Sequence, residues 1–432
     1  MQETPFLTEL DQRAAVKGSR DPLGIQQIWT RLGRRVVGNL TTVSDSPRDF
    51  TTTLLGYYFA EQIAAVTNPG TELATFLKWE QLAAYTRAGL NQDYGFRGTE
   101  RVRRRLSEGT NVTLSDDRAH QILSNQKIYG LWGLYSMPAR TSGLLHDDPT
   151  RLTPTARDFV ERTYLPVLAE GCGSEARRIH EMLRPRAKRI DLEGLEAAAV
   201  KAIARVLRKT LSSKERCFYR YHLLHGGPQD ATQGLQRQLA ELLNETLEDN
   251  SFVWSVARIN SLAKLARRRG QDWHPLSHHL SRVAACESVL APASMLFTHL
   301  LGLDGKSMES TTKRLRDAWG DGLRTVDRVA FSEIGNDIAG GDSQESDRWI
   351  AIAESAALGR YDKLIELLMA QNKVVMSARG GAPWLEHRAG KLHVRFRDEQ
   401  GHLPTREQLP HLWRFPYFLE SLRRVAVAVK ED

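Results

Sequence analysis

The sequence predicts a mainly α-helical, multi-domain protein with an embedded winged-helix-like segment and a small α+β unit at its C-terminal end. Three observations lead to this prediction. Apolar residues recur at helical spacing through most of the chain, and residues 113 to 168 order their helix and turn signals as a winged helix does. Residues 373 to 397 read instead as a strand and a hairpin.

The length and composition describe a folded protein of several domains. The chain has 432 residues, and its hydrophobic fraction of 41% includes 9 Trp, 13 Phe and 11 Tyr, which excludes a disordered scaffold. We divide it into an N-terminal helical domain (1–112), the winged-helix-like segment (113–170), a helical middle domain (171–330) and an α+β C-terminal unit (331–432).

The first domain begins with a helix-start signal. Asp21-Pro22 is predicted to be an N-cap followed by proline at the first helical position. Apolar positions between Asp21 and Ala88 then recur at helical spacing, which predicts helices facing a core.

The segment 113–170 carries the winged-helix pattern. We expect two helices, a turn between two short strands as the wing, and a last helix that begins at Pro154 and is capped by Thr153. In chain order these are the helices Asp116 to Leu123 and Lys127 to Tyr135, an interruption near Met137-Pro138, the strands Leu144-Leu145 and Arg151-Leu152, and the wing His146 to Pro149.

Basic residues make this segment a candidate for nucleic-acid binding. The chain has 60 Lys plus Arg against 52 Asp plus Glu, a net charge of +8, which favours polyanionic partners. Candidate contacts are the run Arg101, Arg103, Arg104 and Arg105, then Asn125 and Lys127 at the start of a recognition helix, and Arg140, Arg151 and Arg157 for phosphates. Asp147 and Asp148 at the wing oppose phosphate contact, so a winged helix used only for protein contact stays an alternative.

The remaining chain predicts more helices and a short hairpin. Helical patterns cover residues 195–207, 235–247, 252–265 and 276–290. We expect a strand at Lys373 to Ser377, a hairpin that turns at Ala389-Gly390, and a last helix over about 409–429.

Catalytic motifs are mostly missing. Gly302 to Ser307 lacks the Walker A spacing, and the group Asp272, His274, His278, His279 and Cys286 lacks an HExxH motif. The acidic segment 333–347 is expected to be a solvated loop, and it supplies the alternative hypothesis of a metal-dependent nuclease. Its candidate ligands are Glu333, Asp337, Asp342, Glu345 and Asp347.

Cysteine usage and the N-terminus predict a cytoplasmic location. Cys172, Cys217 and Cys286 are widely spaced without a CxxC pair, which favours a reducing compartment. The start MQETPFLTEL lacks the pattern of a signal peptide, and we expect no membrane contact.

Three stretches resemble a known group of proteins. DPLGIQQIWTRLGRRVVGNLTTVSDSPRDF (21–50), GLWGLY and SGLL…RLTPTARDF are similar to uncharacterised bacterial antiphage defence-island proteins that open with a DPLG motif. The resemblance covers about the first 170 residues and brings no catalytic residues. It implies a cytoplasmic accessory of a multi-protein defence system that acts beside helicase, ATPase or nuclease partners encoded in the same operon.

These inferences predict a non-catalytic subunit without a cofactor, which binds DNA, expected to be duplex, and assembles with other proteins. Two alternatives remain open at this point, the metal-dependent nuclease and a protein-only scaffold or adaptor.

Overall fold

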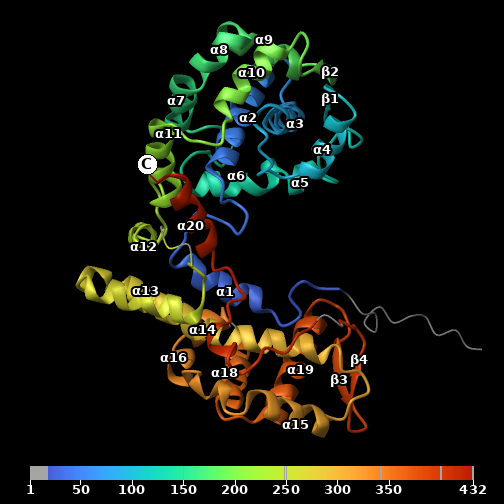
Figure 1. Ribbon diagram of the computed structural model, residues 1–432, viewed down its shortest axis with the longest axis vertical. Coiled ribbons are helices and arrows are strands. Elements are labelled where there is room, and N and C mark those ends of the chain that lie inside the picture. Colours follow the sequence, from blue (N-terminus) through green and yellow to red (C-terminus); the bar gives the residue numbers. More distant parts are fainter. Residues whose placement is uncertain are drawn as a thin grey trace, which may run out of the picture. The chain divides into compact units, whose positions relative to one another are not determined.

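The chain folds into two compact, mainly helical units, which Figure 1 shows in a computed structural model that describes residues 18–148, 150–247, 249, 251–340, 343–398 and 401–430. Unit 1 comprises Met1–Val36 and Asp249–Tyr417, and unit 2 comprises Val37–Glu248 and Phe418–Asp432. The predicted helical class and the small two-stranded sheet near the C-terminus are confirmed. The four-part division of the chain stays a prediction.

Unit 2 is built around a helix that is buried on all sides. Its elements are α2 (Pro47–Val66), α3 (Glu72–Asn91), α4 (Thr99–Ser107), β1 (Asn111–Ser115), α5 (Gln126–Tyr129), α6 (Leu131–Thr141), α7 (Pro154–Thr163), α8 (Leu165–Cys172), the 3-10 helix η2 (Ser174–Ala176), α9 (Arg177–Leu183), β2 (Ala187–Asp191), α10 (Ala197–Val206), α11 (Ser213–Tyr219), the π-helix η3 (Arg220–Leu224), α12 (Leu235–Asn244) and α20 (Leu419–Ala428).

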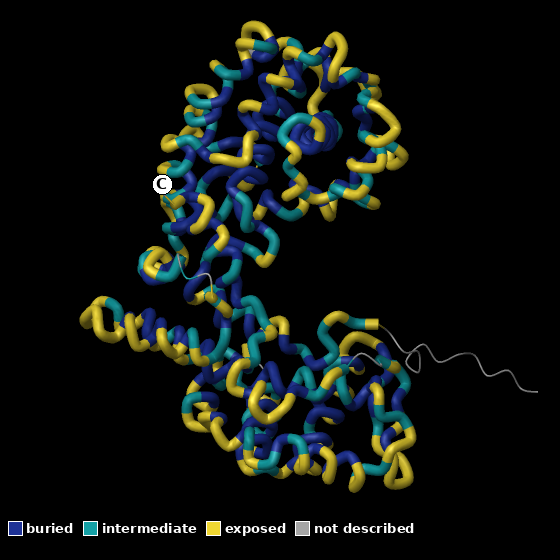
Figure 2. The backbone as a smooth tube through the Cα atoms, viewed as in Figure 1, coloured by how far each residue is buried: buried dark blue, intermediate teal, exposed yellow. Residues whose placement is uncertain are grey.

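Helix α3 is the centre of unit 2. It contacts α2, α4, α6, α10 and β1, and Figure 1 shows it end-on with these elements around it. Every residue from Thr75 to Ala88 is buried (Figure 2). The Trp79 indole N–H donates to the Thr52 carbonyl at 2.8 Å, which satisfies a polar group inside the core.

Unit 1 packs around its own long helix. Its elements are α1 (Ile25–Arg34), α13 (Val256–Arg268), the 3-10 helix η4 (Gln271–Trp273), α14 (His274–Leu300), α15 (Met308–Trp319), the 3-10 helix η5 (Gly322–Thr325), α16 (Arg328–Ser332), α17 (Gly335–Ala339), α18 (Ser343–Ala357), α19 (Tyr361–Ala378), β3 (Leu385–Arg388), β4 (Lys391–Val394) and the 3-10 helix η6 (Leu409–His411).

Helix α14 forms the core of unit 1. It contacts α1, α13, α16, α18 and α19. Among the described residues, the stretch Gln271–Leu300 is the one helical stretch long and apolar enough to cross a membrane, but 72% of its most apolar window is buried inside the protein. That burial is the property of a core helix of a globular unit.

The DPLG motif forms the turn that starts α1. The Asp21 carboxylate accepts the backbone N–H groups of Ile25 at 2.8 Å and Gln26 at 2.9 Å, so it satisfies the first donors of α1 although the N-cap residue is Gly24 and not Asp21 as predicted. Pro22 is not the first helical residue, because Gly24 adopts a φ of 74° and the helix begins only at Ile25.

The predicted winged helix is not confirmed, and several of its predicted elements are wrong. Residues 116–123 form turns instead of a helix, and they follow strand β1, which pairs antiparallel with β2. The second predicted helix is split into α5 and α6 at Gly130, where the backbone is extended. Pro138 does not interrupt α6, which continues to Thr141.

The later part of the segment is closer to the prediction. Leu145 and Leu152 form an antiparallel bridge, and the Arg151 carbonyl accepts the His146 N–H at 2.8 Å. Thr153 caps α7 with its hydroxyl, which accepts the Ala156 N–H at 3.3 Å, and Pro154 is the first helical residue.

We expect Thr153→Ala to lower the free energy of unfolding by about 1 kcal/mol, because it removes the cap of α7. Thr153→Ser keeps the hydroxyl and should restore most of the loss. Urea unfolding followed by circular dichroism measures the difference. The control is Thr155→Ala, at an exposed position two residues later, and an equal loss in that variant would contradict the assignment.

The C-terminal hairpin is confirmed and the strand predicted before it is wrong. Strands β3 and β4 pair antiparallel across Ala389 and Gly390, whose φ angles of 48° and 76° suit a tight hairpin turn. Lys373 to Ser377 lies inside α19, where Met376 continues the buried face of that helix and Val374 is exposed. The acidic segment 333–347 also contains helix α17 and the start of α18 instead of one solvated loop.

Candidate anion-binding cavity

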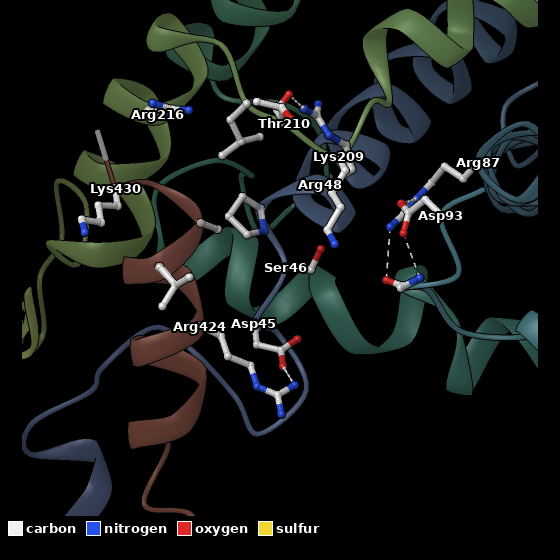
Figure 3. A pocket seen from close by; sticks show the side chains of 15 residues that line it. Asp45, Ser46, Arg48, Arg87, Asp93, Lys209, Thr210, Arg216, Arg424 and Lys430 are labelled. Atoms are coloured by element: carbon white, nitrogen blue, oxygen red, sulfur yellow. Dashed lines mark hydrogen bonds and ion pairs between the residues drawn. The ribbon is translucent and has the colours of Figure 1, made fainter. Parts of the chain in front are cut away.

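Unit 2 contains a cavity of about 800 Å³ between four segments that lie far apart in the sequence (Figure 3). The segments are the start of α2 with the residues before it, the end of α3 with the loop after it, the α10–α11 turn with α11, and the end of α20 with Lys430 shortly after it. The lining residues are Asp45, Ser46, Pro47, Arg48, Arg87, Asp93, Gly95, Lys209, Thr210, Leu211, Arg216, Arg424, Val427, Ala428 and Lys430.

The lining is strongly cationic. It contains six basic side chains, of Arg48, Arg87, Lys209, Arg216, Arg424 and Lys430, and two acidic ones, of Asp45 and Asp93. The lining residues alone carry a formal excess of four positive charges, although carboxylates outside the lining, those of Glu215, Asp49 and Glu420, also pair with its arginines. Cations collected in a concave, low-dielectric wall attract anions more strongly than the same cations spread on a flat surface.

Arg48 fixes one wall of the cavity. Its guanidinium donates to the buried Glu215 carboxylate at 2.6 Å and to the carbonyls of Val206 at 2.8 Å and Thr210 at 3.3 Å. Burial raises the pKa of Glu215, but the charge and hydrogen bonds of Arg48 outweigh it and leave the pKa below its ordinary value. This buried pair ties the α10–α11 turn to the start of α2 and so places Lys209 beside the cavity.

Arg87 fixes a second wall. Its guanidinium lies 2.5 Å from Asp49 and 2.8 Å from Asp93, and it donates to the Gly95 carbonyl at 3.1 Å. Burial lowers the pKa of Arg87, but the two carboxylates outweigh this effect and raise the pKa above its ordinary value. Arg87 is therefore a permanent cation that orders the loop after α3.

A third wall comes from α20. Arg424 donates to Asp45 at 2.8 Å and to Glu420 at 2.8 Å, which holds the last helix against the loop before α2. The pKa of Arg424 lies above its ordinary value, chiefly because of the hydrogen bond to Glu420.

The start of α2 adds a helix dipole to this charge. Ser46 caps the 20-residue helix by accepting the Asp49 N–H, and both Ser46 and Pro47 line the cavity. Aligned peptide dipoles place partial positive charge at a helix N-terminus, which favours a bound anion there.

The described lining differs from residue to residue in exposure and ion pairing. Its two carboxylates, Asp45 and Asp93, are both held by arginines. Lys209 is exposed, while Arg48 and Arg87 are almost fully buried. The lining therefore offers a solvent-accessible cation in Lys209, while the buried Arg48 and Arg87 are already paired with carboxylates, and an exposed cation in a concave lining suits a phosphate or another anion.

The predicted arginine run lies on α4 and is partly engaged by its own unit. Arg105 donates to the Tyr85 hydroxyl and to the carbonyls of Ala119 and His120, and Arg101 donates to the Gln121 carbonyl. Arg103 stacks on Tyr94 with its Cζ atom 3.9 Å from the ring centroid. Arg104 is exposed.

The other predicted contacts have different roles. Asn125 caps α5 through its side chain, and Lys127 is exposed on that helix. Arg140 pairs with Asp147 at 3.4 Å, and Arg157 pairs with Glu61 at 2.5 Å, so both charges are partly neutralised. Arg151 is exposed. The structure does not gather these residues into one cavity, and none of them lines the one described above.

Sequence reasoning missed every cation of the cavity. Arg48, Arg87, Lys209, Arg216, Arg424 and Lys430 belong to no basic run that distinguishes them. Periodicity and composition report on neighbours in the sequence, whereas this site depends on contacts between residues up to 379 positions apart, such as Asp45 and Arg424. No signal in the single sequence marks them as a set.

The acidic candidates for a nuclease do not converge. Asp337 pairs with Arg282 and lies 3.6 Å from Arg35, while Glu333 and Asp347 are exposed. Asp342 lies outside the described residues. Among the residues that the structure describes, no group of three His, Cys, Asp or Glu side chains is placed to hold a metal ion.

Comparisons with known proteins give no further guide to this site. No protein-family model matches the chain, and no curated protein or solved structure shows a significant match to it.

Proposed function

We propose that this protein is a non-catalytic nucleic-acid-binding and assembly subunit, and that the cavity of unit 2 takes phosphate groups of the nucleic-acid backbone. One observation carries the proposal, which is the convergence of six cationic side chains from four distant segments on a single cavity. Phosphate contacts supply most of the affinity of proteins that bind nucleic acid without sequence preference.

The exposed cations predicted from the sequence belong to the same proposal. Arg104, Lys127 and Arg151 are exposed, and no carboxylate of the described chain lies within salt-bridge distance of them. In the segment 113–170, we therefore propose Lys127 and Arg151 as phosphate contacts. The proposal does not require a complete winged helix. The assembly role, the DNA partner and the defence context are proposed from the sequence alone, and no surface is assigned to them.

The test compares two lysines that differ in their place relative to the cavity. Lys209 lines the cavity, and Lys214 is exposed on α11 outside it. We expect Lys209→Glu to weaken binding of a fluorescein-labelled 20-base-pair DNA duplex about tenfold and to reduce the salt slope by about one. Fluorescence anisotropy between 50 and 300 mM salt, roughly the range where phosphate contacts are lost, measures both quantities.

Lys214→Glu is the matched control, because it reverses the same charge five residues away. We expect less than about a twofold change for it. Equal effects of the two substitutions, or binding that does not depend on salt, would overturn the cavity as the phosphate site. A triple variant tests the exposed cations in the same assay. It combines Arg104→Ala, Lys127→Ala and Arg151→Ala.

A further inference from the structure

The end of the α13–α14 helix pair in unit 1 carries a second concentration of positive charge. Helix α13 packs against α14, and the two are joined by Arg269, Gly270 and the 3-10 helix η4. Residues 256 to 282 contain six Arg or Lys residues and a single acidic residue, Asp272. The whole chain, with 60 Lys plus Arg against 52 Asp plus Glu, is much closer to balance.

Three of these cations are exposed on the last turns of α13. They are Lys264, Arg267 and Arg268. In the described parts of the chain, no carboxylate lies within salt-bridge distance of any of the three. Lys264 and Arg268 are four residues apart, so they lie on one face with Cβ atoms about 6 Å from each other.

The beginning of α14 lies next to these cations in the chain and carries aromatic and imidazole side chains. Trp273 is half-buried, and the Cζ atom of Arg269 lies 4.5 Å from its ring centroid. His274 and His278 are exposed on the first turns of α14, which contain no acidic residue.

The helix dipoles explain the cations at the C-terminal end of α13 but not the residues at the N-terminal end of α14. Cations at the C-terminal end of α13 stabilise that helix by about 0.3–1 kcal/mol, which accounts for Arg267 and Arg268. The N-terminal end of α14 favours acidic side chains for the same reason, yet it presents two histidines instead. The dipole of α13 also leaves Lys264 unexplained, because Lys264 lies before the last turn of that helix.

We propose that this end of the helix pair, the basic tip formed by Lys264, Arg267, Arg268, Arg269 and His274, is a second contact surface for the phosphate backbone of nucleic acid. The cations stand on the exposed end of two helices instead of facing one point in a cavity. That geometry suits a linear polymer of repeated negative charges, and the Trp273–Arg269 pair adds a flat group beside it. The basic tip is in unit 1 and is independent of the cavity in unit 2.

The experiment uses the full chain and the same labelled duplex. The basic-tip variant combines Lys264→Ala, Arg267→Ala and Arg268→Ala. It is expected to weaken binding at least about tenfold at roughly 100 mM salt and to lower the salt slope by up to about three. The matched control is Lys313→Ala, Arg314→Ala, Arg316→Ala, which removes three exposed cations from α15 of the same unit. We expect less than about a twofold change for it.

The combination with Lys209→Glu separates this proposal from the cavity. If both surfaces bind, the combined variant loses more affinity than either parent. If the cavity does not bind, Lys209→Glu has no effect while the basic-tip variant still loses affinity and slope. A basic-tip variant that keeps the wild-type helix content, dissociation constant and salt slope would overturn the proposal.

Discussion

Arg48→Met is expected to lower the free energy of unfolding by about 3–5 kcal/mol, because it leaves the buried Glu215 carboxylate without its cation. The side chains of Arg48 and Glu215 are each only 5% exposed, so water cannot replace the lost partner. Tyr164 and Thr51 also bond to this pair and would lose part of their network. Urea unfolding followed by circular dichroism measures the loss.

A double-mutant cycle tests the cause of this loss. Glu215→Gln in the Arg48→Met background removes the unpaired charge, and we expect it to recover about 1–3 kcal/mol. Arg208→Met is the control, because Arg208 is exposed and next to the same turn. Additive effects of the two substitutions, or a loss of the same size in Arg208→Met, would show that the ion pair does not hold this wall of the cavity.

Glu287 is expected to make unit 1 less stable as the pH rises. It is fully buried on α14, where it accepts the N–H groups of Arg414 and Phe415 and the Tyr417 hydroxyl at 2.9 Å. Burial raises the pKa of Glu287 from 4.5 to about 8. The folded chain therefore binds a proton that the unfolded chain has lost between these two values.

The sign of the effect follows from this difference. The contribution of Glu287 to stability is complete below pH 4.5, declines as the pH rises, and is lost above about pH 8. Its size is a few kcal/mol, since each pKa unit corresponds to about 1.4 kcal/mol. Glu80, buried in unit 2 with its pKa raised to about 7, acts in the same direction.

Glu287→Gln tests this prediction, because the amide keeps the size and the acceptor oxygen but does not titrate. Chemical unfolding at pH 5, 6.5 and 8, which are about the points that span the window, is expected to show a smaller decline in this variant. Glu354→Gln, at an exposed position on α18, serves as the control. A decline as steep in Glu287→Gln as in the wild type would show that Glu287 is not the titrating group.

Part of the fold could be predicted because its signals are local. Thr153-Pro154 starts α7, Asp21 accepts the first N–H groups of α1, and Ala389-Gly390 turns the β3–β4 hairpin, each through bonds or angles within a few residues. Residues 116–123 were predicted to be a helix because their spacing was compatible with one. There the chain follows strand β1, whose partner β2 lies more than 70 residues later.

The candidate site could not be predicted for the same reason. Basic runs such as residues 101–105 and 267–269 are visible in the sequence, but the isolated cations Lys209 and Lys430 are not. The structure also shows that part of a basic run serves the fold, as Arg105 does when it binds the carbonyls of residues 119 and 120.

The sequence by itself determined that this chain is helical, positively charged and provided with specific helix starts and one hairpin turn. Those properties depend on side-chain periodicity, backbone preferences and composition, which act between near neighbours. Only the tertiary structure decided which cations line a common cavity, which form ion pairs with carboxylates such as Asp49 and Glu215, and which stay exposed. Burial and ion pairing depend on distances in space, and these arise only when α2, α3, α11 and α20 pack together.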